Sequence, residues 1–417
     1  MSRVFAKYRI ESAFPLEAVA AAMAGEQSTG TFLKLAAEDD PRVARQAASV
    51  ESLSDLGPVE GASLPGAKRP KDRPADWRQG IVGLSWPLAN FGPSLPNLMS
   101  TVAGNLFELN QLSAIRLLDL ELPGEFLDRY PGPAFGPKGT RQLAGVERFP
   151  LVGTIVKPSV GLTPDATADL VATLVDGGID FIKDDELQAD GPLCPFEDRV
   201  KAVMRVVNAA ADKRGCKPMV AFNLTGEIDE MRLRHDIVAA AGGTCVMVSL
   251  NSVGLAGVAE LRRHSTLPIH AHRNGWGLYY RSPHIGIDFR AYQKIWRVVG
   301  VDHMHVNGLR NKFAEDGASS IASARACLTP LSESHPRLAM PVFSSGQWAG
   351  QVPETYAALG SADLIYCCGG GIVAHPQGVK AGVESIREAW AAAFDGESLE
   401  SRARSHPALA AALAFFQ

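Results

Sequence analysis

The sequence predicts an α/β protein in which a smaller N-terminal α+β domain precedes a C-terminal (β/α)8 TIM barrel. Its 417 residues exceed what one hydrophobic core usually serves, so two domains are expected. From about residue 150 onward, short apolar runs alternate with helical patterns, which is typical of βαβ units and a parallel sheet. Eight strands close a barrel of this kind, and eight apolar runs occur. They begin at Leu151, Ile179, Pro218, Cys245, Leu267, Val301, Met340 and Leu364.

Amphipathic segments lie between these runs. Residues 165–178, 198–215 and 384–394 repeat apolar side chains at helical spacing, and the first two segments end in glycine, as helix C-caps often do. We expect them to form an outer ring of helices.

The first part of the chain has a different pattern. A helical run covers residues 16–30, and a second apolar segment covers 100–123. The Pro/Gly-rich stretch at 131–139 is typical of a linker. We therefore expect domains at 1–138 and 139–417.

The composition argues against several classes of protein. Charged residues make up 21% and the formal net charge is -4, with no polybasic stretch for nucleic acid or anionic lipid. No apolar run is long enough to span a bilayer, and the N-terminus lacks a signal-peptide core. The six cysteines are too sparse for a disulfide framework and lack CxxC spacing. A cytoplasmic enzyme without nucleic acid or membrane partners is expected.

Polar residues collect where the predicted strands end. In a (β/α)8 barrel, the C-terminal ends of the strands surround the active-site mouth. The residues at these ends are Lys157, Lys183, Asp184, Asp185, Glu186, His270, His272, Arg273, His303 and His305.

The sequence KDDE at 183–186 predicts a magnesium site. Because side chains of a strand alternate between two faces, Lys183 and Asp185 point the same way, and Glu186 can turn in beside them. Two carboxylates suit Mg2+ better than Zn2+. An ammonium group would be repelled by the ion, unless the amine loses its proton and reacts with CO2 to form a carbamate. The alternative is an ordinary charge cluster with a salt bridge.

Two HxH pairs, at 270/272 and 303/305, are weaker signals. Such pairs can bind zinc or iron, but hydrogen bonding and proton transfer are favoured here. His235 and His264 lie in helical or loop contexts and are expected at the surface.

Glycines follow the last two predicted strands, in SSG at 344–346 and GGG at 369–371. Free backbone N–H groups in such turns bind phosphate in many barrels, so a phosphorylated substrate is expected. Lys312 lies in the polar loop NGLRNKFAED, which could close as a lid. The alternative for Lys312 is a solvated surface lysine.

Together these segments resemble, over nearly the whole chain, the large subunit of ribulose bisphosphate carboxylase/oxygenase (Rubisco). In GTIVKPSVGLTPD, Lys157 matches the proton-transfer lysine of that family. In GGIDFIKDDE, Lys183 matches its carbamylated lysine, and Asp185 and Glu186 match its magnesium ligands. The resemblance implies Mg2+ and a CO2-derived carbamate on Lys183 as cofactors.

The resemblance also implies catalytic roles for His272 and Lys312. In GEQSTGTF and STVAGNLF, Glu26, Thr31 and Asn105 match residues that complete the active site of a partner subunit, so a homodimer is implied. Further matches to substrate- and phosphate-binding residues are Arg273, His305, Ser344, Gly346, Gly369 and Gly370.

Departures from the family pattern indicate the subclass. Ser159 replaces a lysine, Phe32 a tryptophan, Trp276 a histidine and Ser345 a glycine. This set is similar to that of Rubisco-like proteins, which do not fix CO2. Asn105 stands where the methionine-salvage enolases of the family use a lysine as base.

The retained groups favour one reaction. In Rubisco the lysine at the position of Lys312 faces a carboxylate, so keeping it with Lys157 and Asn105 suggests a substrate that carries a carboxylate. We expect decarboxylation or hydrolytic cleavage of a branched β-keto acid phosphate such as 3-oxo-isoapionate 4-phosphate. The alternative is an isomerase or enolase acting on 5-methylthioribulose 1-phosphate or a related methylthio-sugar phosphate. A non-enzymatic scaffold is disfavoured because the metal and base positions are all filled.

Overall fold

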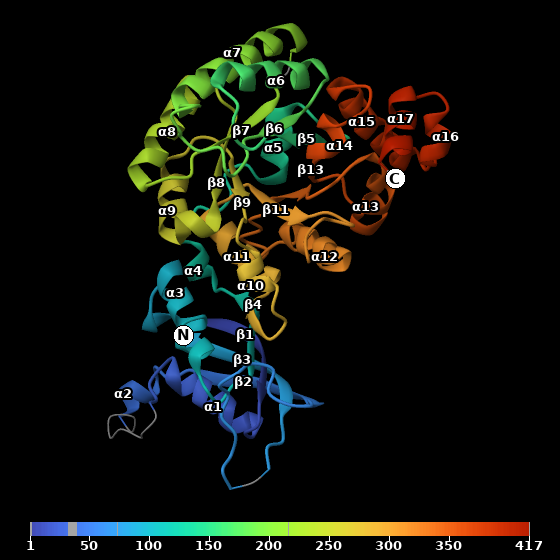
Figure 1. The fold of residues 1–417 in the computed structure, drawn as a ribbon. Helices are drawn as coiled ribbons and strands as arrows, with labels where there is room; N and C mark the ends of the chain where they lie inside the picture. The colour runs from blue at the N-terminus through green and yellow to red at the C-terminus, as the bar shows by residue number, and fades with distance from the viewer. Residues whose placement is uncertain (1, 32–39, 73, 216, 417) are drawn as a thin grey trace. The chain divides into compact units, whose positions relative to one another are not determined.

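The computed structural model describes residues 2–31, 40–72, 74–215 and 217–416. Phe32, one of the departures named above, lies outside these residues, as does Cys216. Contacts divide the chain into two compact units, each of which can be followed in Figure 1. The boundary at residue 138 stays a prediction. The first unit is Met1–Tyr130 with Gly275–Trp296, and the second is Pro131–Asn274 with Arg297–Gln417.

The second unit contains a closed barrel of eight parallel strands, which confirms the predicted fold class. Each predicted apolar run contains one strand. Strands that follow one another in the barrel pair in sequence order, and β9 pairs with β11, His303 opposite His270. The strands are β5 (Leu151–Ile155), β6 (Phe181–Lys183), β7 (Met219–Asn223), β8 (Cys245–Ser249), β9 (Ile269–His272), β11 (His303–Asn307), β12 (Met340–Ser344) and β13 (Ile365–Cys367).

Helices surround this barrel (Figure 1). Helix α6 begins at Pro164 because the Thr163 hydroxyl accepts a hydrogen bond from the Ala166 N–H, and α7 ends where Gly215 takes a left-handed φ of 70°. Helix α5 begins inside the stretch expected to be a linker. The helices are α5 (Gly136–Ala144), α6 (Pro164–Asp176), α7 (Phe196–Arg214), α8 (Ile228–Ala240), α9 (Leu250–His264), α12 (Gly317–Leu328), η4 (Ala349–Gln351), α13 (Val352–Leu359), α14 (Gly369–Val373), α15 (Val379–Asp395), α16 (Leu399–Ala403) and α17 (Pro407–Phe415).

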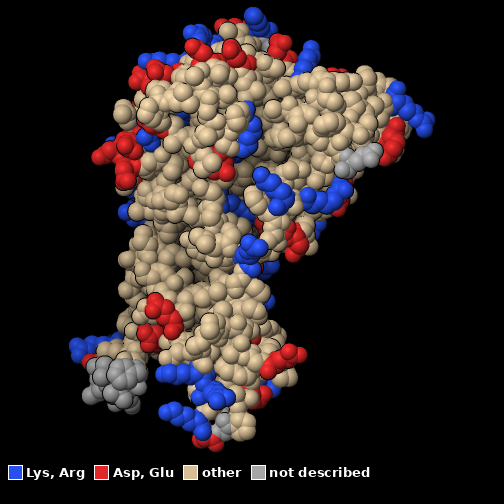
Figure 2. All heavy atoms as spheres, in the orientation of Figure 1, with Lys and Arg blue, Asp and Glu red and all other residues tan. Residues whose placement is uncertain are grey.

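The barrel interior is packed with apolar side chains, including Leu151, Phe181 and Met247. On its outer helices, acidic and basic side chains are interspersed over the face drawn in Figure 2. Among the described residues, no helix is both long and apolar enough to cross a membrane.

The first unit is built on a five-stranded sheet in the order β10-β4-β1-β3-β2. Antiparallel pairing joins β1 to β3 and to β4, and Tyr8 and Trp86 are buried in this unit. The strands are β1 (Arg3–Ser12), β2 (Ser49–Pro58), β3 (Arg78–Pro87), β4 (Ala114–Glu121) and β10 (Ile285–Ile287). The helices are α1 (Leu16–Glu26), α2 (Pro41–Ala44), η2 (Leu88–Asn90), α3 (Leu95–Val102), η3 (Asn105–Glu108), α4 (Gly124–Leu127), α10 (Gly277–Tyr280) and the part of α11 (Phe289–Val299) up to Trp296.

Residues 275–296 leave the barrel sequence after β9 and join the first unit. There β10 pairs in parallel with β4, with Ile285 opposite Ile115. An aromatic cluster holds the segment together, and its closest ring pair, Trp276 and Tyr292, has centroids 4.6 Å apart. The barrel therefore closes through β9 and β11, although β10 lies between them in the chain.

Candidate active site

Lys157, Ser159 and Asp185 form one hydrogen-bonded group after strands β5 and β6. Lys157 Nζ donates to Asp185 Oδ2 at 2.5 Å and to Ser159 Oγ at 2.8 Å. Ser159 Oγ donates to the same carboxylate oxygen at 3.1 Å. Burial alone would raise the pKa of Asp185, but the hydrogen bonds from Lys157 and the Leu187 N–H, together with the charges of Lys183 and Lys157, outweigh it and hold the pKa below its usual value.

Lys183 is an almost fully buried amine at the end of β6. Its side chain is 1% exposed, and Nζ lies 3.6 Å from Glu186 Oε2. Nζ also donates to the Asp184 carbonyl oxygen at 2.8 Å. Desolvation lowers the pKa of Lys183, although the charge of Glu186 opposes the shift. Burial thus favours the neutral amine, which is the form that reacts with CO2.

Asp184 faces the opposite way and belongs to the wall of the barrel. Its Oδ2 accepts hydrogen bonds from Arg199 Nη2 at 3.2 Å and from the Asn223 N–H at 2.9 Å. All three residues are buried. The two neighbours of Asp184 are the ones that take part in the polar group at the strand ends.

His272, the last residue of β9, contacts Glu186 at the strand ends. Its Nε2 lies 3.4 Å from Glu186 Oε2, and its Nδ1 accepts the Asn274 N–H at 3.2 Å. The proton of the neutral ring is therefore on Nε2, facing the carboxylate. Desolvation, aided by the nearby charge of Lys183, lowers the pKa of His272 to about 3, so the ring is neutral near pH 7.

His305 extends the polar group toward β12. Its ring centroid lies 4.5 Å from that of His272, and its Nδ1 lies 3.2 Å from Ser344 Oγ. Its buried Nε2 has no hydrogen-bond partner among the described residues. Since a buried polar atom usually has a partner, this nitrogen fits a role in binding a substrate.

Arg273 and Lys312 differ in their surroundings. Arg273 is buried, and its Nη2 donates to Glu315 Oε2 at 2.7 Å. Lys312 is exposed on the loop after β11, with its N–H donating to the Ser345 carbonyl oxygen at 3.2 Å and its Nζ 5.3 Å from the Phe313 ring centroid. Sequence reasoning missed Glu315, because an acidic residue in a polar loop carries no signal of burial.

The glycines after β12 and β13 have different constraints. Gly346 has a φ of 91°, and the preceding Ser345 also takes a left-handed φ, of 73°. Gly369 and Gly370 open helix α14. A Cβ at Gly346 or Gly370 would meet no atom within 4 Å, so both backbone segments are open to a ligand.

Three predicted site residues belong to the first unit. Glu26 is the last residue of α1, and Asn105 is the first of η3. With its amide oriented to satisfy its neighbours, Gln27 accepts the Asn105 N–H at 3.1 Å and joins the two segments. Glu26, Thr31 and Asn105 are all exposed. Their part in the active site of a partner subunit stays a prediction.

The comparisons with known proteins identify the family. The model of the ribulose bisphosphate carboxylase large chain, catalytic domain, matches residues 136–416, and that of its N-terminal domain matches 2–126. The chain belongs to the Rubisco large-chain family. This confirms the resemblance found in the sequence.

Its relatives in the Rubisco family include Rubisco-like proteins. The 3-oxo-isoapionate-4-phosphate transcarboxylase/hydrolase of Xanthobacter autotrophicus is 59% identical over 415 residues, covering 100% of this chain and 99% of the relative. The 3-oxo-isoapionate-4-phosphate decarboxylase of Rhizobium etli is 43% identical and covers 98% of this chain and 97% of its own. A crystal structure of a Rubisco-like protein from Burkholderia fungorum aligns with a TM-score of 0.93 and 45% identity, covering 100% of both chains.

The Rubisco-family carboxylates Asp185 and Glu186 could hold a hard cation. Both are anionic oxygen donors, and Lys183 lies beside them. Lys157 and Ser159 now use Asp185 Oδ2, so metal binding there would require them to turn away. The donor set fits Mg2+, provided that Lys183 becomes an anionic ligand.

A second group of possible ligands, His235, Asp236 and His264, lies on α8 and α9. Asp236 Oδ1 is 3.0 Å from His235 Nδ1 and 2.6 Å from His264 Nε2. His235 Nε2 accepts the Thr266 N–H at 3.2 Å, so the ring proton is on Nδ1 and donates to Asp236. We therefore interpret the group as a set of hydrogen bonds that joins two helices rather than as a metal site. His235 is buried, so its expected surface position was wrong.

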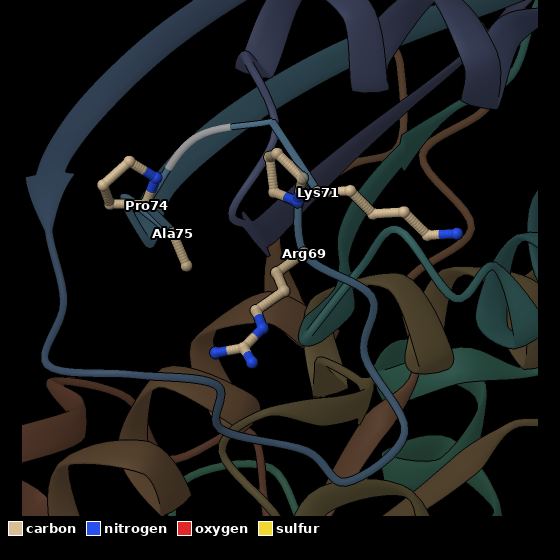
Figure 3. Close-up of a pocket in the computed structure, with 5 residues that line it drawn as sticks. Arg69, Lys71, Pro74 and Ala75 are labelled. Atoms are coloured by element: carbon tan, nitrogen blue, oxygen red, sulfur yellow. The ribbon is translucent and has the colours of Figure 1, made fainter.

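A cavity of about 390 Å3 lies in the first unit. It is lined by Arg69, Pro70, Lys71, Pro74 and Ala75, and Arg69 and Lys71 extend in different directions from their segment (Figure 3). Both cations are exposed. None of the predicted site residues lines this cavity, so it is not the candidate active site.

Proposed function

We propose that this Rubisco-family protein is a magnesium-dependent enzyme that cleaves a carbon-carbon bond of 3-oxo-isoapionate 4-phosphate, by decarboxylation or hydrolysis, without fixing CO2. The observation that carries the proposal is the 59% identity, over the whole chain, to a relative named for this substrate. Two neighbouring sets of contacts support it: Lys157 with Asp185, and Lys183 and His272 with Glu186.

The chemistry follows from the substrate. In a β-keto acid, the bond between the carboxylate and the carbon next to the ketone breaks and CO2 leaves. The electron pair of that bond stays on the carbon and is delocalised onto the ketone oxygen as an enediolate. Mg2+, held by the residues named below, would supply positive charge to the developing oxyanion. Lys157 Nζ holds a proton at the edge of the group, where it can protonate the resulting carbon. Lys312, on its exposed loop, supplies a cation for the carboxylate.

Lys183, Asp185 and Glu186 would hold the metal, with Lys183 as its carbamate. The lowered pKa of Lys183 supports this role, because the neutral amine is the reactive form. His272 and His305 would donate hydrogen bonds to substrate oxygens. The phosphate would be bound by residues that follow β9 and by those at the ends of β12 and β13. These are Arg273, Ser344, Gly346, Gly369 and Gly370.

The proposed assembly is a homodimer in the cytoplasm. Glu26, Thr31 and Asn105 would complete the active site of the partner subunit, as the family resemblance implies. Their exposure in the chain is compatible with this role.

Cleavage with carboxyl transfer or hydrolysis is favoured over simple decarboxylation. The relative named for transcarboxylation and hydrolysis is 59% identical, and the one named for decarboxylation is 43% identical. Decarboxylation and carboxyl transfer both begin by breaking the bond to the carboxylate. In hydrolysis, water adds to the ketone carbon, the bond from that carbon to its neighbour breaks, and the neighbour takes up a proton. All three reactions place negative charge on an oxygen of the substrate, so the same group of residues would serve each of them.

NMR product analysis tests the proposal. The protein is incubated with Mg2+, bicarbonate and 3-oxo-isoapionate 4-phosphate, with Lys183→Ala as control. Release of CO2 or formation of cleaved acids by the unaltered protein alone is expected. An unreacted substrate, together with turnover of 5-methylthioribulose 1-phosphate, would overturn the proposal in favour of an isomerase.

A further inference from the structure

Glu315 is a buried carboxylate in the otherwise exposed loop that carries Lys312. The loop runs from β11 to α12, and its tip, including Lys312 and Phe313, faces solvent. The side chain of Glu315 is 2% exposed. Because a buried carboxylate is costly unless its oxygens are paired, its partners indicate what this residue does.

The partners of Glu315 come from three different elements. Oε2 accepts hydrogen bonds from Arg273 Nη2, which follows β9, and from Asn307 Nδ2, at the end of β11, both at 2.7 Å. Oε1 accepts from Ser319 Oγ, in the first turn of α12, at 2.9 Å. One side chain therefore ties the foot of the loop to two neighbouring barrel strands.

The backbone of the loop is closed above this foot. Asn311 Nδ2 donates to the carbonyl oxygens of Gly308 and Glu315, both at 2.9 Å. The Lys312 N–H donates to the Ser345 carbonyl oxygen at 3.2 Å. The backbone of Lys312 is thus held on two sides: by the hydrogen bonds of Asn311 to the carbonyl oxygens on either side of it, and by its own hydrogen bond to the turn after β12.

Arg273 is held by the same carboxylate. A charge-assisted hydrogen bond of 2.7 Å is strong and directional, so it fixes the guanidinium plane. We propose that Glu315 is a positioning residue: it orients Arg273 toward the substrate phosphate and sets the backbone from which Lys312 reaches the substrate carboxylate. Glu315 does not itself contact substrate, and the proposal rests on the function proposed above.

Glu315→Gln tests the proposal, because it keeps the shape of the side chain and removes its charge. The matched control is Glu354→Gln: Glu354 pairs with Arg310 of the same loop at 3.3 Å, but it is 54% exposed. Glu315→Gln is expected to lower kcat/KM for 3-oxo-isoapionate 4-phosphate by about tenfold or more, with both a fall in kcat and a rise in KM. Glu354→Gln is expected to change it by less than about twofold.

A double-mutant cycle separates positioning from mere stability. In the proposal Glu315 affects kcat through Lys312 and KM through Arg273, so in a Lys312→Ala background Glu315→Gln should cause no further fall in kcat but should still raise KM. If the two losses in kcat multiply instead, Glu315 does not act through Lys312, and the proposal is wrong. Where Glu315→Gln fails to fold, Glu315→Asp, which keeps the charge on a shorter side chain, replaces it in the same cycle.

Trypsin cleavage after Lys312 gives a readout that needs no substrate. Mass spectrometry of the full-length protein should find faster cleavage after Lys312 in Glu315→Gln than in the unaltered protein, and an unchanged rate in Glu354→Gln. Equal rates in all three would overturn the anchoring of the loop. If the unaltered protein does not turn over the substrate, the proposed function is wrong. If it is active and Glu315→Gln leaves its kcat and KM unchanged, only the positioning role of Glu315 is wrong.

Discussion

Asp302 is a fully buried carboxylate before β11, and its replacement by asparagine tests how charge is held at the amino-terminal end of the barrel. Oδ1 accepts the N–H groups of Phe135 at 2.6 Å and Gly136 at 3.1 Å. Oδ2 accepts from the Ile269 N–H at 2.9 Å and from Arg262 Nη1 at 3.0 Å. The side chain therefore joins the start of α5, the start of β9 and the end of α9.

Asp302→Asn would leave these donors without a full set of acceptors. The side-chain amide nitrogen of asparagine cannot accept a hydrogen bond. The two donors that face whichever carboxylate oxygen it replaces therefore lose their acceptor, and the buried Arg262 loses its counter-ion. Desolvation raises the pKa of Asp302 and lowers that of Arg262, so both charges are held against a cost of burial. Breaking such a pair costs about 3–5 kcal/mol. Arg262 also donates to the carbonyl oxygens of Ser265 and Leu267, so it keeps two acceptors when the carboxylate is gone. We therefore expect a loss at the lower end of this range, about 3 kcal/mol of the free energy of unfolding.

Asp363→Asn is the matched control, because Asp363 pairs with Arg141 at 2.6 Å but is 46% exposed. Its loss is expected to be about 1 kcal/mol or less. Urea unfolding followed by tryptophan fluorescence gives both free energies of unfolding, provided that the slopes agree. Asp302→Asn should be the more destabilised by about 2 kcal/mol. Equal losses would refute the argument that burial sets the difference.

Four other changes test the candidate site. Burial lowers the pKa of Lys183, so a larger fraction of this amine is neutral than in an exposed lysine at the same pH, and the fraction grows as pH rises. With 13C-bicarbonate, NMR should therefore show a carbamate signal that strengthens with pH and is lost in Lys183→Arg. A signal that survives in Lys183→Arg would place the carbamate on another residue. Removal of divalent ions with EDTA should abolish turnover and added Mg2+ restore it, whereas turnover in EDTA would argue against the carboxylate pair as a metal site. Lys157→Ala should lower kcat by about 100-fold or more, because the proton donor is lost. An unchanged kcat would remove Lys157 from proton transfer. Gly346→Ala should destabilise the fold by about 1–2 kcal/mol because of its φ of 91°, and Gly370→Ala, which lacks that constraint, should not; equal urea midpoints would contradict the strain.

The barrel could be predicted because each strand carries its own signal. Strands β7, β8 and β12 are buried along their whole length, so each is a short run of mostly apolar residues. Polar residues that directly follow such runs must lie at the carboxyl ends of the strands. This is why Lys157, Lys183 and His272, which end three of the predicted runs, could be assigned to the barrel mouth from the sequence alone.

The segment 275–296 and the role of Glu315 could not be predicted in the same way. Strand β10 has three residues, and its partner β4 lies far earlier in the chain, so no local pattern marks the pairing. Glu315 is buried because Arg273, which follows a different strand, meets it in space. In both cases a tertiary contact determines the structure of residues whose local sequence is typical of an exposed loop.

Charge balance would link the proposed carbamate and the proposed metal ion. The chain supplies two carboxylates, Asp185 and Glu186, each already close to a lysine: Lys157 at 2.5 Å and Lys183 at 3.6 Å. A divalent cation added to this group would leave a surplus of positive charge in a largely buried site, which is costly. Converting the Lys183 ammonium into a carbamate changes its charge from positive to negative and offsets the cation. In the proposed function, each of the two cofactors would therefore remove the electrostatic cost that the other would impose alone, and the buried Lys183, whose pKa is lowered by desolvation, would be the residue that couples them.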